Sequence, residues 1–145
     1  MFGSWNSETL NSFDLVDSGK HLDWDGNSNY KYSFQSAVRK YNAYKSGIIR
    51  ADSLSVIQDV DIADYYEVSS VVTKTTSNGH IRFNQYNMDS QTDNENLADC
   101  MFALGMALGL GKTSVKTDVM YQYVNSVTDL SANDKASYDE AYKKY

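Results

Sequence analysis

The chain has 145 residues, the size of one domain, and its 13 basic and 19 acidic residues give a net charge of −6. An acidic chain without basic clusters argues against nucleic acid and anionic membranes as partners. We therefore expect a domain that binds neither of them, and we also expect it to be a monomer.

Three further features narrow the class of protein. The longest apolar run, residues 101–111, is too short to span a bilayer and contains glycines. Residues 1–20 are polar and lack the apolar core of a signal peptide, so we expect no signal peptide in this chain. The single cysteine, Cys100, excludes an internal disulfide.

The N-terminal half is predicted to combine one helix with several strands. Residues 1–20 are interpreted as a polar lead-in and residues 21–145 as the domain. A short strand over residues 21–25 is followed by a turn at residues 26–29. Apolar side chains at helical spacing predict a helix over residues 32–45, and Gly47 is well placed to follow its last turn.

The next segment is predicted to form most of the sheet. Runs rich in β-branched and aromatic residues predict strands over residues 48–50, 55–60 and 65–72. The pair Asn78-Gly79 is typical of a turn in a hairpin, and the alternation in residues 80–86 predicts a half-buried strand. Because these strands precede the remaining helices without βαβ alternation, we expect a mixed sheet with helices packed on it.

Two capping boxes predict the remaining helices. Thr92 and Glu95 open a helix that runs to about Leu108, and its two apolar stripes predict that it is buried. Gly105 inside this helix costs about 1 kcal/mol relative to alanine, so we expect a close contact there. A second capping box, residues 131–134, begins a C-terminal helix with Tyr138, Ala141, Tyr142 and Tyr145 on one face.

The buried helix and the segment after it carry a resemblance to a known family. Residues 102–112 read Phe-Ala-Leu-Gly-Met-Ala-Leu-Gly-Leu-Gly-Lys, and Asp-Val-Met-Tyr follows at residues 118–121. This pattern resembles the zinc metalloproteases of the metzincin clan, matrixin type, whose signature is HExxHxxGxxH followed by a methionine turn. Residues 79–84 and 130–145 also resemble small bacterial matrixins.

In register with a typical matrixin helix, every functional position is replaced. Phe102, Met106 and Lys112 take the positions of the three zinc-binding histidines, and Ala103 takes that of the glutamate general base. Met120 takes the position of the methionine in the turn. Phenylalanine offers no ligand, a thioether binds zinc poorly, lysine repels a divalent cation and alanine moves no proton.

The resemblance implies a fold, a parent activity and a place of action. The fold would be zincin-like α/β (α+β), with a twisted mixed sheet and three helices that include a buried former active-site helix. The parent activity would be that of a secreted, zinc-dependent endopeptidase that cuts extended peptides lying along an edge strand. For this chain we expect no peptidase activity, no zinc and no other cofactor.

The pattern of replacement leaves three interpretations open. All four functional positions changed while the glycines and Met120 stayed, which favours deliberate removal of the zinc site by engineering. A natural pseudoprotease that binds peptides or proteins in the old cleft is the first alternative. A residual metalloprotease that uses an unexpected metal is the second.

Other motifs are weaker. Residues 109–113 resemble the tail of a P-loop, but they close a predicted helix instead of opening one. Asp23, Asp25, Asn27 and Asn29 alternate like the start of an EF-hand loop but lack its glycine and its final glutamate, so a polar turn is the better interpretation. Cys100, His80 and Asp99 form a weak candidate for a substitute zinc site.

Overall fold

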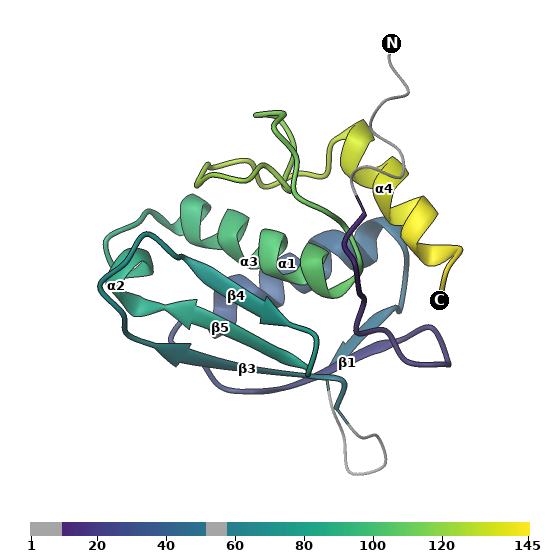
Figure 1. The fold of residues 1–145 in the computed structure, drawn as a ribbon, viewed down its shortest axis with the longest axis horizontal. Helices are drawn as coiled ribbons and strands as arrows, with labels where there is room; N and C mark the ends of the chain where they lie inside the picture. Colours follow the sequence, from purple (N-terminus) through teal and green to yellow (C-terminus); the bar gives the residue numbers. More distant parts are fainter. Residues whose placement is uncertain (1–9, 52–57) are drawn as a thin grey trace.

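The structure is a computed structural model that describes residues 10–51 and 58–145. Its elements are, in chain order, β1 (Leu22–Gly26), α1 (Lys31–Tyr44), β2 (Ile49–Ala51), β3 (Val60–Tyr65), β4 (Thr73–Thr76), β5 (His80–Asn84), α2 (Gln85–Met88), α3 (Asp93–Ala107) and α4 (Ala132–Tyr142). They form an α/β domain with one five-stranded sheet and four helices (Figure 1).

The sheet has the strand order β2-β1-β3-β5-β4, and only the pairing of β4 with β5 is antiparallel. The predicted mixed sheet is thereby confirmed, and β4 forms one of its edges. The expected absence of βαβ alternation was wrong, because α1 connects β1 to its parallel neighbour β2. Both strands and the helix between them were predicted, but the parallel pairing of β1 with β2 joins residues 27 apart in the chain, and local patterns do not show it.

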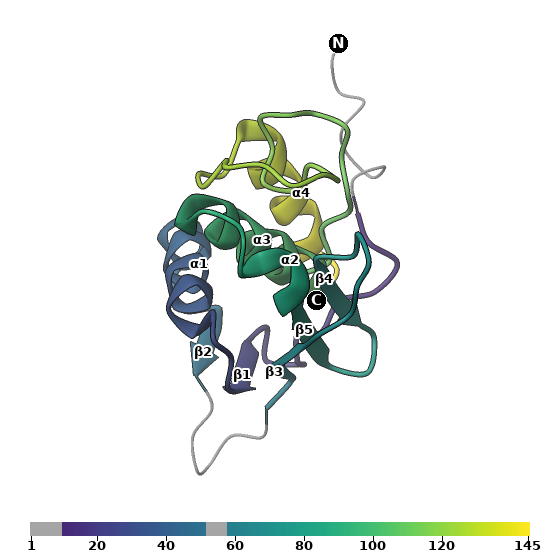
Figure 2. The same cartoon turned by 90° about the vertical axis from the view of Figure 1, so that its left-hand side faces the viewer.

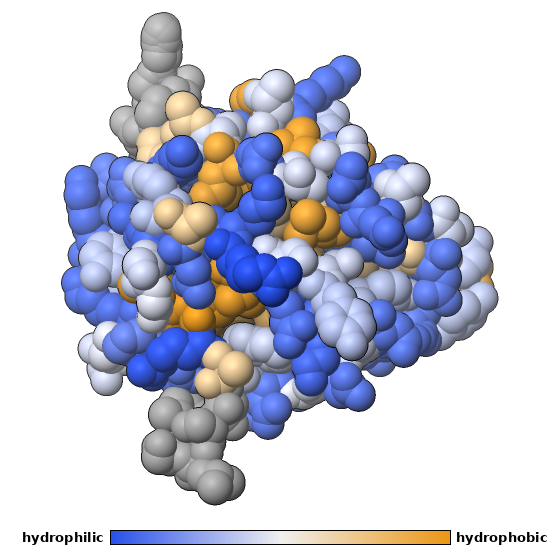
Figure 3. Space-filling view, turned by 180° about the vertical axis from the view of Figure 1, so that it is seen from behind, coloured by the Kyte–Doolittle hydropathy of each residue, from blue (hydrophilic) through white to orange (hydrophobic). Residues whose placement is uncertain are grey.

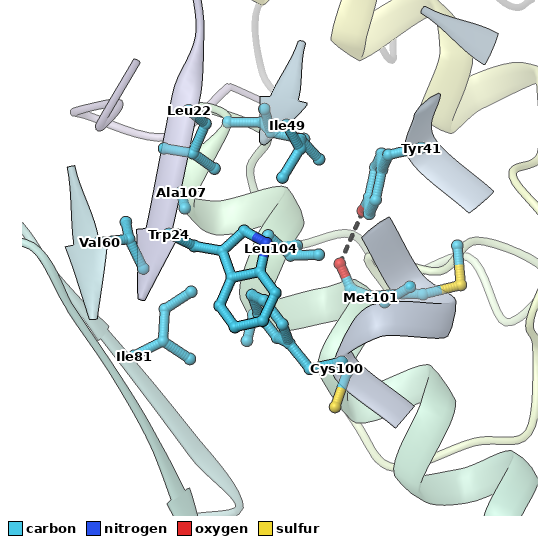
Figure 4. Packing of buried hydrophobic residues seen from close by; sticks show 14 of the residues in the cluster. Leu22, Trp24, Tyr41, Ile49, Val60, Ile81, Cys100, Met101, Leu104 and Ala107 are labelled. Carbon is cyan, nitrogen blue, oxygen red and sulfur yellow. Dashed lines mark hydrogen bonds between the residues drawn. The ribbon is translucent and has the colours of Figure 1, made fainter. Parts of the chain in front are cut away.

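The core lies between one face of the sheet and the helices. Helices α1 and α3 lie side by side on that face, and α4 lies beyond them (Figure 2). Alternate residues of β1, β3 and β5 point into the core, as the two-residue period of a strand requires. Figure 4 shows Leu22, Trp24, Val60 and Ile81 on the side of the sheet that faces the helices. The buried apolar residues of the sheet include Leu22, Trp24, Ile49, Val60, Ile62, Ile81 and Phe83.

The three predicted helices are confirmed: α1 and α3 lie within one residue of their predicted bounds, whereas α4 ends at Tyr142, before Tyr145 of the predicted face. Both capping boxes are formed, with Thr92 and Ser131 each accepting the backbone N–H of the third helical residue. Helix α1 buries Phe34, Ala37 and Tyr41 on its predicted face. The predicted number of three helices missed the single turn α2.

The strand predictions were less accurate around residue 70. The predicted strand over residues 65–72 was wrong beyond Tyr65, where β3 ends. The buried Asn84 side chain accepts the N–H of Glu67 and donates to the carbonyls of Glu67 and Val71, which holds this segment as a loop. Asn84 also caps α2, so β5 ends there and not at residue 86. Of the predicted strand 55–60, residues 55–57 lie outside the described residues, and Val60 begins β3.

Part of the lead-in is attached to the domain. Residues 1–9 lie outside the described residues, but Leu10 forms a β-bridge with Leu110, and Asn11 and Leu15 donate backbone hydrogen bonds to the carbonyls of Gly109 and Ala107. Seen from behind, the described surface is mainly hydrophilic with small, separate apolar areas (Figure 3). Among the described residues, every helix falls short of the length and apolar character that crossing a membrane requires.

Candidate functional site

Helix α3 ends where the matrixin pattern places its turn. Gly109 adopts a positive φ of 96°, which glycine tolerates best, and the N–H of Leu110 donates to the carbonyl of Gly105 at 2.8 Å. Residues 109–113 therefore close a helix and do not open one. This arrangement agrees with the rejection of a P-loop.

Gly105 allows two buried side chains to touch the backbone of α3. A Cβ added at this position would overlap the sulfur of Met120 and lie 2.7 Å from the hydroxyl oxygen of Tyr41. The Tyr41 hydroxyl is fixed, because it donates a 2.6 Å hydrogen bond to the carbonyl of Met101, also in α3 (Figure 4). The expected close contact at Gly105 is confirmed, and Met120 is one of the two residues that make it.

Two buried carboxylates hold the segment that carries Met120. Asp134, in the first turn of α4, accepts the N–H of Val119 at 2.8 Å and that of Met120 at 3.4 Å. Asp118 accepts hydrogen bonds of 2.7 to 2.8 Å from the side chains of Thr113, Ser131 and Asn133. Because both carboxylates are satisfied by donors, the segment is tied to the start of α4 while Met120, 1% exposed, stays against α3.

Three of the four replaced positions line one cleft. Phe102 and Met106 are half-buried, Lys112 is exposed, and all three border a cavity of about 520 Å³. Ala103 is fully buried in the core and does not line the cleft. This donor set does not fit zinc, because it offers a phenyl ring, a thioether and an ammonium group and no imidazole, thiolate or carboxylate.

The cleft lies between α3, the edge strand β4 and residues 119–125. Thr73 and Thr75 are half-buried on the side of β4 that meets α3, and the hydroxyl of Thr75 donates a 3.0 Å hydrogen bond to the carbonyl of Ala103. Lys74 and Thr76 are exposed on the opposite side of the strand. The cleft therefore follows an edge strand, where an extended segment has backbone groups available for pairing.

A carboxyl group without a cation partner lines the same cleft. Asp99 is 6% exposed, and no described residue donates a hydrogen bond to its buried Oδ2 atom. Burial raises the pKa of Asp99 to about 8, with a smaller contribution from the nearby carboxylate of Glu95. The sequence analysis considered Asp99 only as part of a substitute zinc site and did not predict its burial.

Replacing Asp99 with asparagine is expected to change how stability depends on pH. The folded state keeps the Asp99 proton up to about pH 8 while the unfolded state loses it near pH 4, so the free energy of unfolding falls across this interval. Relative to the wild type, Asp99→Asn should gain about 4–5 kcal/mol between pH 4 and pH 8, since one pKa unit corresponds to about 1.4 kcal/mol. Urea unfolding measures the change, and Asp93→Asn, at an exposed position of α3, should show no such gain.

The substitute zinc site is not formed. Within the described residues, the one set of three metal-binding side chains whose ligand atoms lie within 4.8 Å of one another is Asp17, Asp23 and Asp59. Cys100 is instead buried in the core and His80 pairs with Asp61, so the weak candidate from the sequence was wrong. Burial also raises the pKa of the Cys100 thiol, which opposes formation of a metal-binding thiolate.

The carboxylate cluster could not be found from spacing, since its members come from a loop, β1 and the residue before β3. Buried Asp23 already has a cation partner, because Arg50 donates to both of its oxygens at 2.7 and 3.1 Å. The cluster is thus explained as an ion pair with two neighbouring carboxylates. A comparison with known protein families found no match to this chain, and a search of curated proteins likewise found none.

Proposed function

We propose that the chain is a zincin-like domain of the matrixin type that has no peptidase activity and no zinc at the old metal site. The contact of Gly105 with Met120 carries this proposal, because it joins the two parts of the matrixin signature, 15 residues apart, at one point. A buried helix beneath a sheet with an antiparallel edge strand also supports it.

The chemistry of the replaced positions supports the lack of activity. A metalloprotease needs a metal to lower the pKa of water and a carboxylate to take its proton. Phe102 and Met106 offer no suitable ligand, and Ala103 is buried away from the cleft without a group that could accept a proton. No hydrolytic step can therefore be assigned to these residues.

Binding of an extended peptide is the second candidate function. If the side chains of Phe102, Met106 and Lys112 filled the cleft, the structure would favour an engineered metal-free domain that binds no peptide. These residues instead border an open cavity of about 520 Å³ beside the edge strand β4. Addition of a peptide strand to such an edge is a recurrent mode of recognition. The cavity supports the interpretation as a pseudoprotease that retains a binding cleft.

The lack of activity is tested by incubating the purified protein with casein and gelatin. We expect no cleavage above the blank, whether zinc or a chelator is added. We also expect elemental analysis to find fewer than about one metal ion per ten chains. Cleavage that a chelator abolishes would support the alternative of a residual metalloprotease with an unexpected metal. It would overturn the main proposal.

A further inference from the structure

We propose that the cleft binds an extended peptide with one lysine or arginine side chain directed at Asp99. This inference rests on the second candidate function and adds the chemical class of the occupant. It starts from the Asp99 carboxyl, which lines the cavity, is 6% exposed and has an Oδ2 atom without a donor among the described residues. A buried oxygen of this kind is costly unless something donates to it.

A basic side chain fits the walls around Asp99 better than an acidic or a purely apolar one. Phe102, Met106 and Val119 offer apolar surface for the methylene groups of a lysine or arginine, while the charged end reaches the carboxyl. Neither an apolar side chain nor an ionised acidic one has a hydrogen-bond donor to offer the unpartnered Oδ2 atom of Asp99.

The rim of the cleft limits the occupant to one basic residue. Lys112, after α3, is exposed and borders the cavity. It would repel a second cation next to the first and attract acidic flanking residues. We therefore expect an isolated basic residue in a neutral or acidic segment, paired along β4.

Binding of the cation is expected to release a proton. Burial raises the pKa of Asp99 to about 8, so the carboxyl is mostly neutral at pH 7, and a lysine or arginine beside it favours the ionised form. The other titratable residues that border the cleft are Lys112, Tyr121 and Tyr123, and Glu95 lies near Asp99 on α3. Lys74 of β4 also borders it, but its ammonium group lies over the ring of Tyr65. The proton passes from Asp99 to the buffer, and no bond other than its O–H breaks.

The test uses blocked peptides Thr-Val-Ser-X-Ser-Val-Thr, in which X is lysine, arginine, norleucine or glutamate. Titrations followed by NMR locate the binding, and calorimetry gives the affinity. We expect the NMR signals of backbone amides in β4 and α3 to shift. The lysine and arginine peptides should bind at least about tenfold more tightly than the norleucine peptide. In two buffers of different ionisation enthalpy at pH 7, the lysine peptide should release nearly one proton and the norleucine peptide none.

Asp99→Asn should remove the preference for lysine, whereas Asp93→Asn on the exposed side of α3 should keep it. If all peptides bind in the cleft equally and without proton release, the inference about Asp99 is overturned while peptide binding stands. If no peptide binds at β4, peptide binding itself is overturned. Should Asp99→Asn not fold, proton release by the wild type still decides between these outcomes.

Discussion

Replacing Phe102, Met106 and Lys112 together with histidine is expected to create a zinc site. These three positions border one cleft, and Phe102 and Met106, four residues apart on α3, share a helix face. Two imidazoles at this spacing and a third after the turn at Gly109 supply the three ligands of a catalytic zinc site. The Lys112→His change also removes a positive charge that opposes a divalent cation.

Elemental analysis should find about one zinc per chain in the triple variant, and zinc at 100 times its dissociation constant should raise the free energy of unfolding by about 2.7 kcal/mol. The matched control keeps Lys112 and carries only Phe102→His and Met106→His, and it should bind zinc at least tenfold more weakly because it lacks one ligand. A triple variant that folds but takes up no zinc would show that the register with the matrixin helix is wrong.

Activity is expected to need a fourth change, Ala103→Glu, to supply the general base. The buried position of Ala103 makes this the costly step, since the new carboxylate is stable only if it reaches the zinc in the cleft. We expect cleavage of casein by the quadruple variant that a chelator abolishes, and none by the triple variant. If both variants bind zinc and neither cleaves, the cleft lacks the geometry for catalysis.

Gly105→Ala is expected to lower the free energy of unfolding by about 2–3 kcal/mol, because its Cβ overlaps two buried groups. Tyr41 is fixed by its hydrogen bond to the Met101 carbonyl, and Met120 is 1% exposed, so both side chains must shift within the core to admit the new methyl group. At an unhindered position, the same change in a helix would stabilise by about 1 kcal/mol. The sign of the effect, measured by urea unfolding, therefore decides whether the contact exists.

A double-mutant cycle identifies the partner in this contact. Met120→Ala alone should cost about 2–5 kcal/mol through the cavity it leaves, and in the Met120→Ala background the added methyl of Gly105→Ala should cost at least about 1 kcal/mol less than in the wild type. Additive effects would show that Met120 does not meet Gly105. A neutral or stabilising Gly105→Ala would contradict the geometry of α3 and the Met120 segment altogether.

The sequence by itself determined the features that depend on neighbours within one or two turns. The capping boxes at Thr92 and Ser131 fixed where α3 and α4 begin, since the cap is formed by residues three apart. The apolar face of α1 and the end of α3 at Gly109 follow from the same short-range rules. The close contact at Gly105 was also predictable, because glycine destabilises a helix relative to alanine and is expected there only where a larger residue does not fit.

Only the tertiary structure decided which distant residues meet. Strand β4 reads Thr-Lys-Thr-Thr, has no apolar alternation and becomes a strand because it pairs with β5. The cleft that Asp99 lines is formed together with β4 and residues 119–125, and the Asp17, Asp23 and Asp59 cluster is formed by three separated segments. The stability of a turn or a cap depends on residues that are close in the sequence. The desolvation of a carboxyl group depends on all the residues that surround it in space, wherever they lie in the sequence.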